Sequence, residues 1–82
     1  MTEVVLYGRP GCHLCDEARE LLLEIRERHP FTLVERDIES DDDLFRRYLE
    51  RIPVIEIDGE ERFELDFDHQ AVRDALDAKV HD

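Results

Sequence analysis

Two cysteines, Cys12 and Cys15, are the residues of this sequence best suited to covalent chemistry. They are spaced C-x-x-C and are the only cysteines among the 82 residues. In thiol–disulfide exchange one thiolate attacks a disulfide sulfur, and a nearby second thiol can resolve the mixed disulfide that forms. Because residues i and i+3 of a helix share a face, Cys15 would lie within reach of a bond formed on Cys12. The spacing therefore predicts a two-step dithiol mechanism with Cys12 as the nucleophile.

The cysteine pair stands where an expected strand meets an expected helix. Residues 3–7 are nearly all apolar and favour β-structure, and a turn rich in glycine and proline follows at residues 8–11. From Leu14 onward, apolar side chains recur on one helical face, and Pro30 marks the far limit. A thiolate at a helix N-terminus faces free backbone N–H groups and the positive end of the helix dipole, so we expect the pKa of Cys12 to fall.

Four neighbours of the cysteines are candidate substrate-binding or supporting residues. Gly11 would let a substrate approach the sulfur closely, and Pro10 would stiffen the turn that presents it. A protonated His13 would stabilise the Cys12 thiolate, although an exposed residue at a helix start can equally have no role. Arg9 could receive a substrate carboxylate bidentately, or it could pair with an acid of this chain.

A proline later in the chain adds a fifth candidate position. Ile52-Pro53 opens an expected strand, where proline is otherwise unfavourable, so we expect a special turn there and, in the stronger form of the hypothesis, a cis peptide bond. A cis bond would turn the Ile52 backbone outward, so that its N–H and C=O could pair with an extended substrate.

The remaining elements follow from periodicity and turn residues. Strands are expected at residues 31–35, 54–57 and 62–65, the last two joined by an Asp58-Gly59 hairpin. Helices are expected at 44–52, after a Ser40 or Asp41 cap, and at 71–80, after an Asp66 or Asp68 cap, with Val80 as its last apolar position. The predicted order is β-α-β-α-β-β-α, and its opening strand–helix–strand unit implies a parallel pair with a right-handed crossover.

Length and charge limit the classes of function. Eighty-two residues suffice for one domain, which we place at residues 1–82. Because 11 basic and 23 acidic residues give a net charge of −12, binding to nucleic acid or to an anionic membrane is not expected. No 18-residue apolar run and no signal peptide are visible, so we expect a cytoplasmic protein.

Three other interpretations of the cysteines compete with catalysis. A structural disulfide across three residues would stabilise little. A zinc site needs four ligands, and the histidines supply no H-x₃₋₅-H pair to complete one with the cysteines. The four histidines are His13, His29, His69 and His81. Two chains could still share a metal ion or an iron–sulfur cluster. The third alternative is a non-catalytic interaction module whose acidic surface docks basic partners.

Taken together, residues 4–15, the Ile52-Pro53-Val54 step and the Ile57-Asp58-Gly59 hairpin resemble a glutaredoxin-like protein of the thioredoxin superfamily. The resemblance spans nearly the whole chain. It implies an α/β thioredoxin-like fold, a four-stranded mixed sheet with helices on both faces. It also implies that Cys12 attacks, that Cys15 resolves and that Pro53 is a cis-proline beside them.

The resemblance further implies a thiol–disulfide oxidoreductase that acts in cell redox homeostasis. Its substrates would be protein or low-molecular-weight disulfides, and its electron donor would be a thiol reductant. We expect the protein to be a monomer without a tightly bound cofactor. The centre here is C-H-L-C where glutaredoxins commonly have C-P-Y-C. Residues 64–68 stand where a Gly-Gly pair commonly admits glutathione, so glutathione and a protein reductase both stay open as donors.

Overall fold

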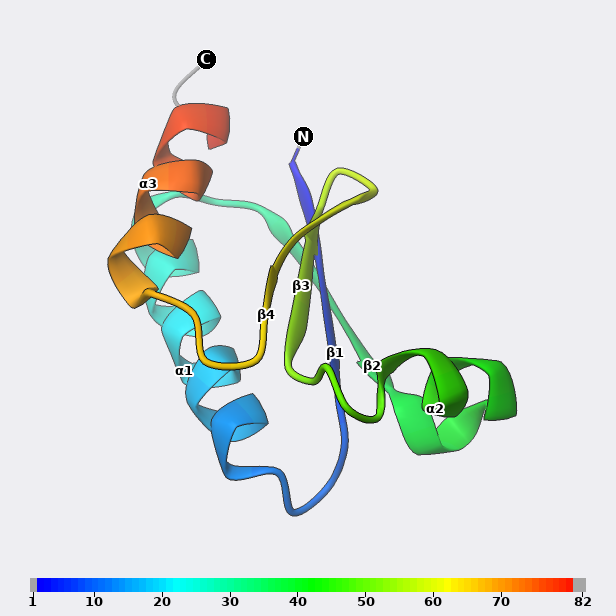
Figure 1. Cartoon of the computed structure of the whole chain (residues 1–82). Coiled ribbons are helices and arrows are strands. Elements are labelled where there is room, and N and C mark those ends of the chain that lie inside the picture. Colours follow the sequence, from blue (N-terminus) through cyan, green and yellow to red (C-terminus); the bar gives the residue numbers. More distant parts are fainter. Residues whose placement is uncertain (1, 81–82) are drawn as a thin grey trace.

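The computed structural model describes residues 2–80 and shows the elements in the expected order (Figure 1). The side chain of Val80 and the whole of His81 lie outside the described part. The elements are β1 (Glu3–Gly8), α1 (His13–Arg28), β2 (Thr32–Asp37), the 3₁₀ turn η1 (Ile38–Ser40), α2 (Asp42–Tyr48), β3 (Val54–Ile57), β4 (Glu60–Glu64) and α3 (His69–Val80).

The four strands form one mixed sheet in the order β2-β1-β3-β4. Strand β1 pairs parallel with β2 and antiparallel with β3, and β3 pairs antiparallel with β4. The α1 crossover joins the parallel pair, as the strand–helix–strand pattern predicted. The thioredoxin-like α/β architecture expected from the sequence is therefore confirmed.

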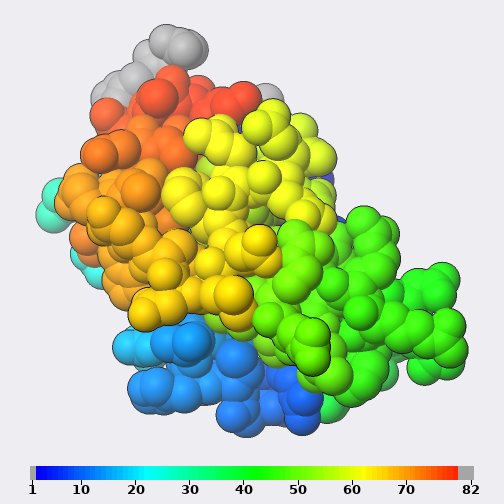
Figure 2. All heavy atoms as spheres, viewed as in Figure 1, coloured from blue at the N-terminus to red at the C-terminus, as the bar shows by residue number. Residues whose placement is uncertain are grey.

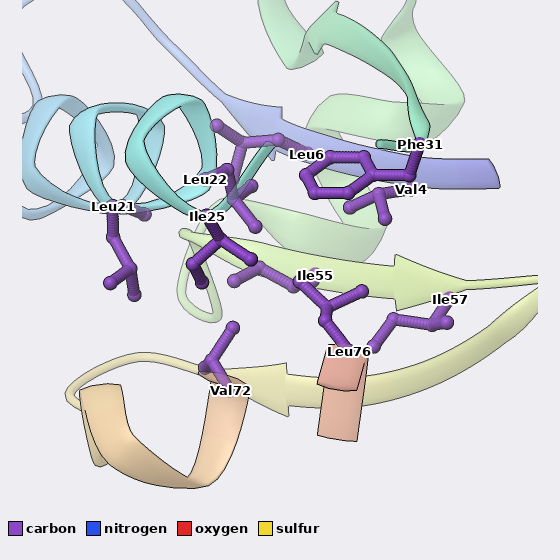
Figure 3. Packing of buried hydrophobic residues seen from close by; sticks show 11 residues of the cluster. Val4, Leu6, Leu21, Leu22, Ile25, Phe31, Ile55, Ile57, Val72 and Leu76 are labelled. Carbon is purple, nitrogen blue, oxygen red and sulfur yellow. The ribbon is translucent and has the colours of Figure 1, made fainter. Parts of the chain in front are cut away.

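Strand β1 is buried on both faces because helices cover both sides of the sheet. Val4 and Leu6 pack with α1 and α3, whereas Val5 and Tyr7 pack on the opposite face with η1 and α2. Figure 1 shows α1 and α3 together on one side and α2 on the other, and Figure 3 shows the larger cluster between α1, α3 and the sheet. This sandwich fixes the end of β1 from which the cysteine loop departs.

Several element boundaries differ from those predicted. Helix α2 ends at Tyr48 instead of reaching residue 52, because the N–H groups of Arg51 and Ile52 both donate to the Tyr48 carbonyl in a closing turn. Strand β2 runs to Asp37 and is followed by η1, which the sequence did not indicate. Strand β4 begins at Glu60, two residues early, because Asp58 and Gly59 form a two-residue turn with φ of 50° and 84°.

Aspartates begin the two later helices, as expected for N-caps. The Asp41 carboxylate accepts the Asp43 N–H at 2.8 Å, and the Asp68 carboxylate accepts the Gln70 N–H at 2.9 Å. Of the alternatives that the sequence left open, the caps are thus Asp41 and Asp68. None of the helices that the structure describes has the length and apolar character of a membrane span.

Candidate functional site: the cysteine pair at the start of helix α1

Cys12 and Cys15 form a disulfide at the N-terminus of α1. Cys12 is the N-cap residue, with extended backbone angles, and its Sγ accepts a hydrogen bond from the Cys15 N–H at 3.2 Å. The Asp16 N–H donates to the Cys12 carbonyl at 3.1 Å, so the helix begins directly after this residue. The sulfur therefore takes the place that a Ser or Asp oxygen occupies in ordinary caps. A negative charge on it would lie at the positive end of the helix dipole.

The two sulfurs differ in access. Cys15 is buried at 6% exposure, whereas Cys12 is only half-buried. Cys12 is therefore the more accessible of the two sulfurs, and the two Cα atoms are 5.2 Å apart. The arrangement suits an outer attacking thiol and an inner resolving thiol.

Glycines shape the loop that presents Cys12. Gly11 has φ of +79°, a region that favours glycine, and the space around it is open. Gly8 is packed against the pair: a Cβ built there would lie 3.1 Å from the Cys15 Cβ and 3.2 Å from its Sγ. The sequence singled out Gly11 but missed Gly8, whose role depends on contact between β1 and α1.

Arg9 lies beside the pair but is engaged with an acid of its own chain. It lines a hollow of about 330 Å³ that Cys15 also lines. Its Nε is 3.4 Å from the Glu39 Oε2, which is the internal pairing that the sequence left open. Reception of a substrate carboxylate by Arg9 stays a prediction and would require exchange with Glu39.

His13 extends into solvent at the start of α1. Its side chain is 88% exposed, and its Nε2 lies 3.8 Å from the Glu17 carboxylate one turn later. The structure thus places the imidazole beside an acid on its own helix.

The Ile52–Pro53 peptide bond is cis. Val54 pairs with Tyr7, so Pro53 lies at the same end of the sheet as Gly8 and the cysteine loop. The Ile52 N–H donates to the Tyr48 carbonyl at 3.0 Å, within the turn that ends α2, and is therefore not free for a substrate in the way expected. Pairing of the Ile52 C=O with a substrate stays a prediction.

Two stacked tyrosines support this end of the sheet from the α2 side. The rings of Tyr7 and Tyr48 have centroids 4.4 Å apart, and their hydroxyls donate to Glu56 at 3.1 Å and to Glu61 at 2.8 Å. Burial, with the hydrogen bond to Glu61, raises the pKa of Tyr48 to about 12. Hydrogen bonds from Arg51 and then from Tyr48 lower the pKa of Glu61. Both phenols therefore stay neutral at ordinary pH and act as a rigid support.

The segment before α3 differs from a glycine-lined ligand site. Leu65 adopts φ of 60°, and its N–H donates to the carbonyls of Arg51 at 3.1 Å and Pro53 at 3.0 Å. Of the two acids that the sequence offered as caps, Asp68 caps α3, and Asp66 is exposed. The unusual Leu65 backbone carried no signal in the sequence, because leucine rarely takes a positive φ.

A metal site does not emerge within the part of the chain described. No group of three or more His, Cys, Asp or Glu side chains is arranged to hold an ion among these residues.

Comparisons with known proteins agree with this fold. Residues 3–77 match the model of a glutaredoxin-like domain (DUF836). A structural-genomics target protein from X. campestris is 36% identical, with 92% of this chain and 96% of that chain covered and a TM-score of 0.73. A Nitrosomonas europaea protein is 30% identical, with 92% and 91% covered and a TM-score of 0.76. A mutant thioredoxin from Halobacterium salinarum, 18% identical with 96% and 74% covered and a TM-score of 0.71, shares the fold. No curated protein matches the chain.

Proposed function

The chain belongs to the glutaredoxin-like domain family, and from this premise we propose that it is a thiol–disulfide oxidoreductase with a dithiol mechanism. The observation that carries the proposal is the Cys12 sulfur at the cap of α1. It accepts the Cys15 N–H and is joined to the buried Cys15. A sulfur in this position is stabilised as a thiolate by the helix N-terminus, and the thiolate is the form that attacks.

The reaction proceeds in two exchanges. The Cys12 thiolate attacks one sulfur of a substrate disulfide, a Cys12–substrate bond forms, and the other substrate sulfur leaves as a thiolate that takes a proton from water. Cys15 then loses its proton to solvent and attacks the Cys12 sulfur. The second substrate thiolate leaves, and two electrons have passed from the cysteine pair to the substrate.

In this cycle the Cys12–Cys15 disulfide is the oxidised form of the protein. An external thiol reductant, glutathione or a protein reductase, attacks it and restores the dithiol. Such turnover suits the reducing cytoplasm, where a disulfide between neighbouring cysteines is transient rather than structural.

Two serine variants test the mechanism with a small neutral disulfide such as hydroxyethyl disulfide. Cys12→Ser should abolish the reaction, because the attacking sulfur is gone. Cys15→Ser should still attack but should accumulate the mixed disulfide on Cys12, detectable as added mass, because no inner thiol resolves it. Wild-type turnover by Cys12→Ser would refute the assignment, and so would a Cys15→Ser protein whose adduct is carried by another residue.

A further inference from the structure

Two exposed leucines flank one hollow next to the cysteine pair. Only three large apolar side chains are exposed among the residues described: Leu14 at 41%, Leu49 at 36% and Leu65 at 47%. Leu14 stands between the two cysteines in sequence, and Leu65 precedes α3. Both line a hollow of about 340 Å³, which we call the Leu14–Leu65 hollow, together with Glu17, Asp66, Phe67 and His69. Figure 2 shows the yellow-to-orange segment before α3 lying directly against the blue start of α1.

The backbone holds Leu65 in its exposed position. Its φ of 60° is unfavourable for leucine, yet its N–H is fixed by the carbonyls of Arg51 and Pro53. Because Pro53 lies at the cysteine end of the sheet, these bonds tie Leu65 to the same end. The apolar side chain is therefore presented on a rigid support beside the reactive pair.

The charge on the hollow selects the occupant. Its lining includes the carboxylates of Glu17 and Asp66 and no lysine or arginine. Asp66 takes part in no ion pair among the residues described. An apolar side chain with a neighbouring cationic one fits this lining. Glutathione carries two carboxylates and one ammonium group, so its disulfide has a net negative charge and fits poorly.

We propose that the Leu14–Leu65 hollow is a subsite for the polypeptide that flanks a substrate cysteine, and that it selects protein disulfides with an apolar and a basic residue beside the cysteine. The inference rests on the proposed oxidoreductase function and specifies its substrate class. Leu14 and Leu65 would contact the apolar residue, and Asp66 and Glu17 the basic one.

The test measures single-turnover rates of the reduced protein with four probes. These are a peptide disulfide with Leu and Lys next to the cysteine, the same peptide with Ser and Glu, glutathione disulfide, and hydroxyethyl disulfide as the small neutral reference. We expect the Leu–Lys peptide to react about tenfold faster than the Ser–Glu peptide, as burial of part of a leucine side chain implies. We also expect it to react faster than glutathione disulfide.

Leu65→Gly removes the side chain while glycine keeps the backbone conformation. This variant should reduce the ratio of the two peptide rates about fivefold. Leu14→Ala, on α1, should also reduce the ratio of the Leu–Lys rate to the Ser–Glu rate. Asp66→Asn should weaken the salt dependence of the Leu–Lys rate. Leu49→Ser is the matched control, since Leu49 is exposed but lies at the end of α2, away from the hollow, and its ratio should equal that of the wild type.

The outcomes separate the two proposals. Reaction with hydroxyethyl disulfide but equal rates for both peptides would overturn the subsite and leave the oxidoreductase intact. The subsite would also be overturned if glutathione disulfide reacted as fast as the Leu–Lys peptide, or if Leu65→Gly slowed every probe alike. No reaction with any probe would refute the oxidoreductase itself.

Discussion

Replacement of Gly8 by alanine should make the cysteine pair more oxidising. Gly8 ends β1 directly against Cys15, and an added Cβ would lie 3.1 Å from the Cys15 Cβ and 3.2 Å from its Sγ. Unstrained contacts between a Cβ and these atoms are longer by a few tenths of an ångström, so the neighbouring atoms must shift. Overpacking of this kind in a core lowers the free energy of unfolding by about 1–3 kcal/mol. The disulfide ties the Cys15 sulfur to Cys12, whereas a reduced Cys15 side chain can rotate away. Rotation relieves the contact with the Cys15 Sγ but not the contact with its Cβ, so only the Sγ share of the cost falls on the oxidised form alone.

The size of the shift follows from the two-electron relation, in which about 1.4 kcal/mol equals 30 mV. The Sγ contact is one of two similar contacts, so we assign it about half of that cost, about 0.5–1.5 kcal/mol, which raises the midpoint potential by about 10–30 mV. The assay equilibrates wild-type and variant proteins in dithiol–disulfide buffers, alkylates the free thiols and counts them by intact mass.

Gly59→Ala is the matched control. Gly59 has φ of +84° and open space around it in the β3–β4 turn, so alanine should lower the free energy of unfolding by about 1 kcal/mol. The potential of that variant should equal the wild-type potential, because the turn lies at the far end of the sheet. A Gly8→Ala protein with a wild-type or lower potential would refute the reasoning.

Two further predictions concern stability. The pKa of Tyr48 is about 12 in the folded chain and 10.0 in the reference state, so the unfolded chain loses this proton first as the pH rises. The free energy of unfolding should therefore fall by about 2 kcal/mol between pH 10 and 12. Urea unfolding of Tyr48→Phe should show a smaller fall, and an identical pH profile would contradict the assigned pKa. Leu76→Ala should lower the free energy of unfolding by about 2–5 kcal/mol, because Leu76 is fully buried between α3 and the sheet. Leu49→Ala, at an exposed position, should change the free energy of unfolding by less than about 0.5 kcal/mol. An equally small loss for Leu76→Ala would show that the contact between α3 and the sheet contributes little to stability.

Local patterns predicted the parts of the fold that depend on local physics. The apolar run of β1 and the one-sided spacing of α1 reflect burial against the sheet, and the Asp58-Gly59 pair reflects the positive φ of its turn. The start of β4 was missed because Glu60 and Glu61 belong to an edge strand whose exposed side chains give no apolar alternation. The early end of α2 was missed because the apolar pattern continues into the closing turn.

The cysteine pair could be located from the sequence because its chemistry depends on three-residue spacing and on a strand–helix junction. The contacts around the cysteine pair could not be predicted from the sequence, because they join segments that are distant along the chain. Arg9 meets Glu39, and Gly8 meets Cys15, only after β1 has packed beside η1 and α1. The unusual backbone of Leu65 likewise depends on hydrogen bonds to Arg51 and Pro53, which no local pattern encodes.

The central claim, that Cys12 and Cys15 form a reversible redox couple, is tested most directly by intact-mass titration of the protein in glutathione redox buffers. Dithiol, disulfide and glutathione-adduct forms are counted at each potential. We predict a reversible two-electron midpoint between about −180 and −270 mV, the interval from protein disulfide isomerase to thioredoxin, with any adduct on Cys12. A pair that never oxidises reversibly, or that does so only at an extreme potential, would contradict the claim.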